Sequence, residues 1–527
     1  MAAAERDTAR GRLAWITFVA VELAGAVLYV ANGRKVWFFG VFGDEWDFLA
    51  GRRLTIHDLL LRHGDHLVAL PALVFRIMYS VVGLRSYLPY QLLSIGLHLV
   101  AAALLRAVMR RAGVRPWIAT VAAGAFVLFG SGSQDILIAF QITFTGALVL
   151  GLIQLLLADH DGPIDRRDAL ALLAGLGALC CSDVAIVMIA AVGCSALLRR
   201  RWRAFALHTL PLAAVYVAWV ESYGRRPHTD LHLSQVASSV RTSLSASFGA
   251  LGVVPLAGWA LAIMLVAGIT ITVVDSRHSA RAASTASTAS TIGLALAAVA
   301  FSLMLAITRF GLGAQFAASS RYLHIIAALV LPALAVAADA MARRWRAVGI
   351  VVLALFLVGV PGNIARIGRN VGPAARYREQ RRTITALPRL HLARTAPRSL
   401  HPTPSFASEV TVGWLLDGAH AGRIPAPGPL TPGERATDNF RLSLEQLGGG
   451  HAPACVALRS PVARRLAAGQ SIGIRGTVAV QSRAPVSQPL VFGTSLLDSA
   501  RTHTLLAVVG PLELRIAPRS PGAAICR

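Results

Sequence analysis

Acidic residues are scarce in this sequence. Its 527 residues include 26 aspartates and glutamates against 51 lysines and arginines, and Lys35 is the only lysine. With 15% charged and 55% hydrophobic residues, the chain has too little charge to cover a soluble protein of this size. Apolar runs near 20 residues recur, which match the roughly 30 Å hydrocarbon thickness of a bilayer at about 1.5 Å per helical residue. The composition therefore predicts an α-helical polytopic membrane protein.

Several functional signatures are also missing. The sequence has no glycine-rich loop ending in Gly-Lys-Ser/Thr, which argues against ATP-driven transport, and no His-Glu-x-x-His zinc motif. It shows no nucleophile elbow in a plausible context, and no inverted repeat or charged mid-membrane relay of the transporter kind. The net charge of +25 comes from arginines dispersed through short loops. Such loops follow the positive-inside rule, so no nucleic-acid partner is expected.

The apolar segments predict about 11–12 membrane helices, with the basic amino terminus on the cytoplasmic side. Residues 67–83 are interrupted by Pro71 and Arg76, and a full crossing there would place the following arginines outside. We therefore expect residues 67–83 to be shallow or non-spanning. The expected spans are residues 13–32, 87–109, 117–130, 136–158, 169–181, 184–198, 205–222, 251–274, 292–308, 322–340 and 347–360.

Composition divides the chain into three parts. Residues 1–361 form the expected membrane domain, with an outer loop at 33–66 and a flexible linker at 279–291, where Ala-Ser-Thr repeats occur. Residues 362–400 are basic and read as a linker. Residues 401–527 predict a small, mainly β soluble domain, because short alternating runs are separated by turn residues.

Within this last part, strands are expected around residues 476–481 and 504–510, and a helix at 407–416. Cys455 and Cys526 are its only cysteines. Such an isolated pair is compatible with a disulfide. Helix parity and this pair favour an extracytoplasmic location for the domain, whereas the arginines after the last span favour the cytoplasm. Because the charge rule is weak for long domains, we expect the outer side.

Three carboxylates, Asp44, Glu45 and Asp47, follow the first span around Trp46. A carboxylate at a membrane edge can act as general base toward an acceptor hydroxyl, and desolvation tunes its affinity for protons. Asp44 and Glu45 are therefore candidate catalytic residues, and Asp47 a substrate-binding residue. The same acids would suit a divalent cation, since hard cations prefer oxygen ligands. The alternative is a solvated loop whose acids cap a short helix.

A second polar cluster is His63-Gly-Asp65-His66. On a helix, His63 and His66 would share a face. With Asp65 they would bind the phosphate of a lipid substrate or a metal ion. A plain interfacial role fits the same residues.

Two further sites lie on the predicted outer side. Gln134 and Asp135 follow a Ser-Gly-Ser turn between two spans, where the alternative is an ordinary helix connection. Arg321 and Tyr322 begin a late span. A guanidinium group there suits phosphate binding, because its donors match phosphate oxygens in pairs. The alternative is an arginine that anchors the helix at the interface.

Over residues 13–340 the layout resembles the GT-C superfamily of integral-membrane glycosyltransferases, which includes protein mannosyltransferase and aminoarabinose transferase types. The matching features are Asp44-Glu45 after a first span, His63-Gly-Asp-His66 leading into Leu70-Pro71, and the step at Gly83-Leu84-Arg85. Many relatives have a Pro-Pro pair where this chain has Leu70-Pro71.

This resemblance implies transfer of a sugar from a polyprenyl-phosphate donor to a glycan or protein acceptor on the extracytoplasmic face of a bacterial inner (plasma) membrane. By that likeness Asp44 or Glu45 would be the general base, and Arg321 would hold the donor phosphate. The alternative is a non-catalytic scaffold, or a flippase- or transporter-like component of cell-envelope assembly, which would not need the two acids.

Overall fold

The computed structural model describes residues 2–38, 44–224, 232–278, 282–309, 312–345, 347–448, 454–483, 486–492 and 502–526. They group into two compact units. The helical unit comprises Met1–Val36, Thr55–Leu73 and Leu88–Gly372. The mixed unit comprises Trp37–Leu54, Val74–Tyr87 and Pro373–Arg527.

The helical unit consists of long apolar helices joined by short turns. Its α-helices are α1 (Ala2–Gly33), α3 (Ile56–Leu60), α5 (Leu88–Arg111), α6 (Pro116–Val127), α7 (Ser133–Leu137), α8 (Ile142–Ala158), α9 (Arg166–Leu179), α10 (Val184–Leu198), α11 (Trp202–Tyr223), α12 (Leu233–Gly252), α13 (Pro255–His278), α14 (Ala282–Thr308), α15 (Ser320–Arg344), α16 (Val348–Leu357) and α17 (Val360–Arg366). Its 3₁₀ turns are η2 (Gly130–Gly132), η3 (Ala139–Gln141), η5 (Ala314–Ala318) and η6 (Arg369–Val371). Helix α4 (Ala69–Val81) belongs to both units.

The described residues include seven helices long and apolar enough to cross a bilayer, or up to nine if each of two bent helix pairs counts as one span. This confirms a polytopic helical membrane protein. The sequence predicted 11–12 crossings, and the difference arises from short helices. For example, the 15 residues of α10 extend about 22 Å, and the 13 residues of α4 about 20 Å, both less than the hydrocarbon thickness. The length of α4 agrees with a segment that does not span.

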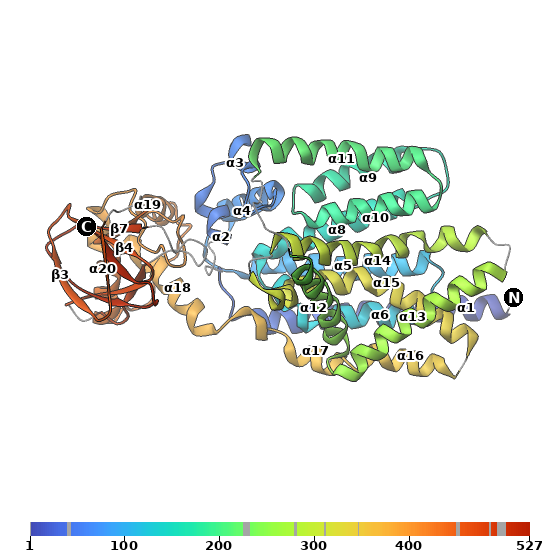
Figure 1. Ribbon diagram of the computed structural model, residues 1–527. Helices are drawn as coiled ribbons and strands as arrows, with labels where there is room; N and C mark the ends of the chain where they lie inside the picture. The colour runs from blue at the N-terminus through green and yellow to red at the C-terminus, as the bar shows by residue number, and fades with distance from the viewer. Residues whose placement is uncertain are drawn as a thin grey trace. The chain divides into compact units, whose positions relative to one another are not determined.

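Close helix packing relies on small residues. Helix α10 contacts α8, α11 and α14, and these helices run side by side in Figure 1. A Cβ atom at Gly293 in α14 would overlap the carbonyl group of Ala191 in α10. Approaches of this kind give membrane helices the packing contacts that hold them together in lipid.

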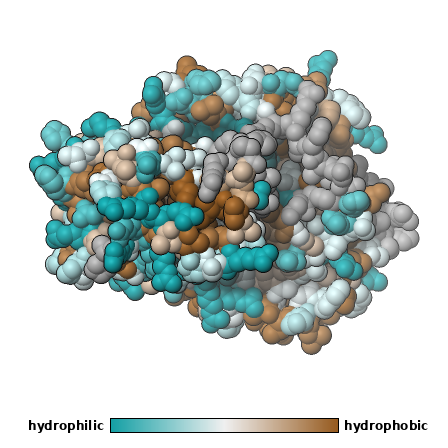
Figure 2. Space-filling model, turned by 60° about the vertical axis from the view of Figure 1, so that its left-hand side comes forward, coloured by the Kyte–Doolittle hydropathy of each residue, from teal (hydrophilic) through white to brown (hydrophobic). Residues whose placement is uncertain are grey.

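Large apolar side chains also remain exposed along the bundle. In α13, Leu256, Trp259, Ile263 and Val266 are each more than 60% exposed. Figure 2 shows brown hydrophobic patches among teal hydrophilic residues on the face that it presents. Exposure of a row of apolar side chains is costly in water and expected in lipid, which agrees with a bilayer environment.

The Ala-Ser-Thr repeats belong to a helix. Residues 279–281 lie outside the described part of the chain, and from Ala282 the repeats continue without a break into α14. The flexible linker predicted at 279–291 is therefore wrong from residue 282 onward. Thr291 shows how such residues fit a helix, because its hydroxyl donates to the Thr288 carbonyl at 2.7 Å.

The mixed unit contains two antiparallel sheets. Their strands are β1 (Leu444–Leu447), β2 (Cys455–Ala457), β3 (Val462–Leu466), β4 (Ser471–Arg475), β5 (Val478–Ser482), β6 (Leu490–Phe492), β7 (Thr502–Ala507), β8 (Leu512–Pro518) and β9 (Ala524–Cys526). The orders are β1-β7-β4-β9-β2 and β3-β8-β5-β6. Alternate residues such as Ile474, Val480 and Ile516 fill one core, which confirms the predicted β domain.

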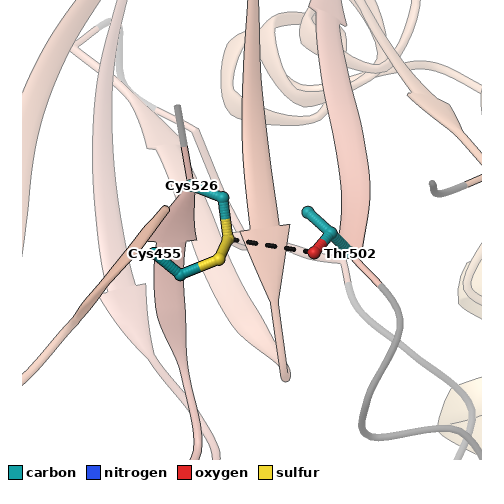
Figure 3. Close-up of a disulfide and its surroundings, with 3 residues drawn as sticks. All are labelled: Cys455, Thr502 and Cys526. Carbon is teal, nitrogen blue, oxygen red and sulfur yellow. Dashed lines mark hydrogen bonds between the residues drawn. A yellow bond between two sulfur atoms is a disulfide. The ribbon is translucent and has the colours of Figure 1, made fainter. Parts of the chain in front are cut away.

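Two features of these sheets affect their edges. Cys455 and Cys526 form a disulfide between directly opposite residues of β2 and β9 (Figure 3). The Thr502 hydroxyl lies 3.9 Å from the Cys526 sulfur. Among the described strands, β3 pairs only with β8, and it exposes Arg464 and Arg465.

The remaining helices of the mixed unit lie either just after α1 or between α17 and the first strand. They are α2 (Asp44–Trp46), the π-helical turn η1 (Asp47–Gly51), α18 (Ala374–Ala386), η7 (Leu387–Arg389), η8 (His391–Arg394), α19 (Val412–His420) and α20 (Pro432–Arg441). The region 362–400, predicted as a linker, thus contains regular helical turns. The helix predicted at 407–416 occurs as α19.

Candidate functional site

A pocket of about 630 Å³ opens at one end of the helical unit, where α12, η2, α7, η5, α15, α17 and η6 meet. We call it the polar pocket. It is lined by Ser131, Gln134, Ala246, Gly249, Ala250, Ala318, Ser319, Ser320, Leu323, Arg366, Arg369 and Asn370. None of these lining residues is acidic and two are arginines, so the pocket is suited to an anionic group.

The wall of the polar pocket depends on a close approach between η2 and α17. A Cβ atom at Gly130 would overlap the backbone carbonyl of Asn363. The buried Asn363 side chain then joins three elements: its Oδ1 accepts from the Ser131 N–H at 3.0 Å, and its Nδ2 donates to the carbonyls of Ala250 at 2.9 Å and Gly359 at 3.2 Å. Asn363 therefore fixes the wall of the pocket without lining it.

The Ser-Gly-Ser turn before Gln134 and the start of α15 meet in this pocket. The Ser320 hydroxyl donates to the Ser131 carbonyl at 2.6 Å and accepts from the Gln134 N–H at 3.3 Å. The Gln134 side chain donates to the Asn370 carbonyl at 3.1 Å. The turn around Gln134 and the start of α15 thus form one hydrogen-bonded rim.

The pocket arginines come from the stretch predicted as a linker. Arg366 is half-buried and donates to the Ser131 hydroxyl at 3.2 Å. Arg369 is exposed at the start of η6. Both guanidinium groups can offer paired N–H donors to phosphate oxygens.

An apolar groove of about 450 Å³ adjoins the polar pocket. It lies in the 110° bend between α12 and α13 and is lined by Arg241, Leu244, Ser245, Phe248, Gly249, Val253, Pro255, Gly258, Trp259 and Ala262. Gly249 lines both spaces. A pocket with two arginines and an apolar groove therefore share one lining residue on α12.

Asp135 does not line the polar pocket. Its carboxylate is fully buried, with Oδ2 3.1 Å from Nδ1 of His324. His324 Nε2 lies 2.9 Å from Nδ1 of His98, and His98 Nε2 lies 3.1 Å from the Val127 carbonyl oxygen. This chain of polar groups ends in the core, which suits a role in fixing α7 against α5 and α15.

Arg321 and Tyr322, the predicted phosphate site, lie against aromatic rings. The Arg321 guanidinium carbon lies 5.3 Å from the Phe316 ring and 5.0 Å from the Tyr322 ring. Tyr322 is buried. Neither residue lines the polar pocket, which takes its positive charge from Arg366 and Arg369.

His63 and His66 lie on a tight turn and not on a helix. Each N–H donates to the carbonyl of the other at 3.0 Å, and Gly64 adopts a φ of +57° between them. The prediction that they share a helix face is therefore wrong. The His66 ring contacts Asp183 and Arg309, while the His63 ring lies 5.2 Å from that of Phe140.

The predicted first-loop acids lie in the mixed unit, and Gly43 before them lies outside the described residues. Glu45 is fully buried, and its Oε1 accepts from the Tyr87 hydroxyl at 2.7 Å. Asp44 is half-buried. Asp47 Oδ2 pairs with Arg52 at 2.7 Å. Burial raises the pKa of Tyr377, and the nearby Glu45 carboxylate raises it further.

Among the described residues, one group has side chains close enough to hold a metal ion: His160, Asp165 and Asp168. Asp168 already accepts from the Asp165 N–H and lies 3.0 Å from both His160 and His208, with Arg201 at 3.7 Å. These partners satisfy the carboxylate without a cation. The cation predicted at Asp44 and Glu45 remains a prediction.

No family model matches this chain, and no curated protein does. The resemblance to GT-C enzymes therefore remains a hypothesis, and the functional argument rests on geometry. Sequence reasoning missed Arg366, Arg369 and Asn363, whose only signal was their place just after the last apolar run. It also missed Asp183 and Arg309, because nothing local in the sequence connects them to His66.

Proposed function

We propose that this protein is a membrane glycosyltransferase that moves a sugar from a polyprenyl-phosphate-linked donor to an acceptor on the extracytoplasmic face. The observation that carries the proposal is the polar pocket with Arg366 and Arg369, which shares the lining residue Gly249 with an apolar groove. A lipid phosphate has these two parts, a charged head and a hydrocarbon chain. The bilayer environment supplies the lipid directly to the groove.

The head of such a donor suits the polar pocket. Its volume of about 630 Å³ lies within the range of small-molecule sites, about 300–1,000 Å³. Two arginines without an acidic neighbour in the lining would hold phosphate oxygens, and Ser131, Ser319 and Ser320 offer hydroxyl groups to a sugar. During transfer, negative charge builds on the departing phosphate, and fixed guanidinium groups stabilise that charge.

The groove suits the start of the prenyl chain. Leu244, Phe248, Val253 and Trp259 provide apolar surface beside the pocket. Burial of hydrocarbon contributes about 25 cal/mol for each Å² removed from water. Because the chain would otherwise lie in lipid, the groove contributes mainly to orientation and places the phosphate at the arginines.

Binding to the pocket can be measured with the full protein in nanodiscs and polyprenyl phosphate as probe. We expect Arg366→Gln and Arg369→Gln each to weaken binding by about 10- to 100-fold, because a hydrogen bond to a charged group contributes about 1.5–3 kcal/mol. Arg203→Gln is the matched control, since Arg203 is an exposed arginine at the start of α11 and lines neither space. Unchanged affinity in both pocket variants would contradict the proposed donor site.

A measurement of donor consumption distinguishes a glycosyltransferase from the non-catalytic alternative. We expect membranes with the wild-type chain to consume a polyprenyl-phosphate sugar, and Asp44→Asn to lose this activity at equal protein level if Asp44 is the base. Lipid binding without turnover of any donor would instead support a flippase- or scaffold-like protein.

A further inference from the structure

Asp183 is placed at the start of α10 but does not cap that helix. Its side chain accepts no hydrogen bond from the backbone of the first turn, although aspartate is among the best residues for this. The Ser182 hydroxyl accepts from the Val184 N–H at 3.1 Å instead. The Asp183 carboxylate is directed at His66, with Oδ2 3.0 Å from Nδ1.

The position of His66 is fixed from two sides. Its backbone is paired with His63 across the turn at Gly64. Its ring meets the Phe144 ring edge to face, with centroids 6.0 Å apart. The imidazole thus has one orientation, with Nδ1 toward Asp183 and Nε2 on the opposite side.

Arg309, which follows α14, covers Nε2 of His66. Its Nη2 lies 3.0 Å from that nitrogen, and its Nη1 lies 3.4 Å from Oδ2 of Asp65. Arginine can only donate hydrogen bonds, so Nε2 accepts and the ring proton is on Nδ1. Oδ2 of Asp183 lies within ion-pair distance of Nδ1, although the two groups do not form a hydrogen bond in this structure. The ring protonated on Nδ1 is the tautomer that an aspartate–histidine pair needs in order to accept a proton at Nε2.

Other ionisable side chains also lie close to this pair. Asp65 and Arg309 face His66 from the loop and from the end of α14, and Tyr216 of α11 lies against Asp183. The side chain of Asp183 is 9% exposed and that of His66 is 19% exposed. The pair is therefore sheltered, and the space beside it, lined by His66, Asp183 and Arg309 among others, has a volume of about 10 Å³.

We propose that His66, oriented by Asp183, is the general base that takes the proton of the acceptor hydroxyl, and that Arg309 covers Nε2 until an anionic substrate draws the guanidinium away. This inference rests on the proposed glycosyl transfer. It assigns the proton to a residue other than the first-loop acids predicted from the sequence.

In the reaction, the acceptor oxygen forms a bond to the anomeric carbon while the bond from that carbon to the phosphate oxygen breaks. The phosphate leaves with the electron pair, and the hydroxyl proton moves to Nε2 of His66. Asp183 stabilises the imidazolium that results, which later releases the proton to water. Arg309, freed from Nε2, offers its paired donors to the anion.

A purely structural role for these residues predicts a different arrangement. An arginine that only ties α14 to α10 would pair directly with the Asp183 carboxylate, which would be the stronger contact. Here a titratable ring lies between the two.

Chemical rescue tests the assignment in the full protein. We expect His66→Gly to lower kcat by about 10²–10⁴-fold, the usual contribution of general base catalysis. Added imidazole should raise the kcat of this variant by at least about tenfold. Asp183→Asn should also lower kcat but should not respond to imidazole. The control is His57→Gly, which removes an exposed histidine of α3 and should leave kcat unchanged.

Arg309→Gln provides a separate readout. Because it uncovers Nε2 and removes a donor to the anion, we expect the KM for the lipid-linked sugar to rise and kcat to fall less than it does in His66→Gly. A fall in kcat as large as that of His66→Gly would contradict the covering role.

The experiment distinguishes a failure of the proposed glycosyl transfer from a failure of the assignment of His66 as the base. If the wild-type chain turns over no lipid-linked sugar, the proposed function fails and the base assignment with it. If the wild type is active but His66→Gly keeps its turnover, or loses it without rescue by imidazole, only the assignment to His66 is overturned. Asp44→Asn in the same assay shows whether the base is the Asp44 carboxylate or the His66 imidazole.

Discussion

Removal of the Cys455–Cys526 disulfide should destabilise the mixed unit by an amount that follows from its place in the chain. The bond closes a loop with a sequence separation of 71 residues. Loop closure restricts the unfolded chain, and the chain-entropy relation gives about 4 kcal/mol for a loop of this length at 25 °C. The disulfide holds edge strand β2, which within the described part of the chain pairs with β9 alone, so the loss of structure should be local to this edge.

The assay is urea unfolding of the full protein in nanodiscs, followed by pulse proteolysis and detection of fragments that start beyond Pro373. With a urea m-value of about 2 kcal/mol/M, Cys455→Ala/Cys526→Ala should lower the unfolding midpoint by about 2 M. Reductant should give the same shift in the wild type and none in the double variant.

A midpoint that moves by less than a tenth of the expected shift would refute the loop-closure reasoning. The redox state of Cys455 and Cys526 in cells tests the location of the β domain, since disulfides persist in oxidising compartments. If Cys455 and Cys526 react with an alkylating reagent without prior reduction in freshly quenched cells, the predicted extracytoplasmic location of the β domain is wrong.

Two further outcomes concern single side chains. Asn363→Ala should lower the stability of the helical unit by about 3 kcal/mol, because it leaves buried backbone groups at Ser131 and Ala250 without partners; thermal unfolding in detergent measures this, and an unchanged Tm would contradict it. The backbone N–H and hydroxyl of Thr431 lower the pKa of Glu434 in the α20 capping box. The Glu434 carboxylate therefore stabilises the folded mixed unit fully above the pKa of the unfolded chain, about 4.5, and this stabilisation is lost as the pH falls through the lower pKa of the folded state. Glu434→Gln should make the free energy of unfolding of the mixed unit less dependent on pH in this interval.

The sequence predicted the features that depend on local pattern. Long apolar runs gave membrane helices, and alternation near residues 476–481 and 504–510 gave β5 and β7. The Ala-Ser-Thr repeats misled because small polar residues are typical of linkers in water. Inside a helix, serine and threonine hydroxyls donate to carbonyls of the preceding turn, as Ser302 does to Ala298 at 2.9 Å, so the same residues are accepted in a bundle.

In the candidate site, the contacts between distant segments could not be predicted from local sequence patterns. Gln134 was predicted as a candidate at a helix end, and the fold brings it together with Ser320, the residue before the candidate Arg321, at one rim. Their separation from Asp135, by contrast, follows from which side of α7 each residue occupies. The His66–Asp183 contact joins segments far apart in the sequence, and only the packing of the turn against α10 creates it.

The exposed arginines of β3 have a consequence for a protein confined to a membrane. Neighbouring copies in a bilayer are held at a high two-dimensional concentration, with their extramembrane parts in repeated lateral collision. An unpaired strand edge invites a strand from another copy, and charged residues on that edge oppose such pairing. Arg464 and Arg465 on this edge therefore favour separate sheets, so that crowding in the membrane does not lead to sheet-to-sheet aggregation.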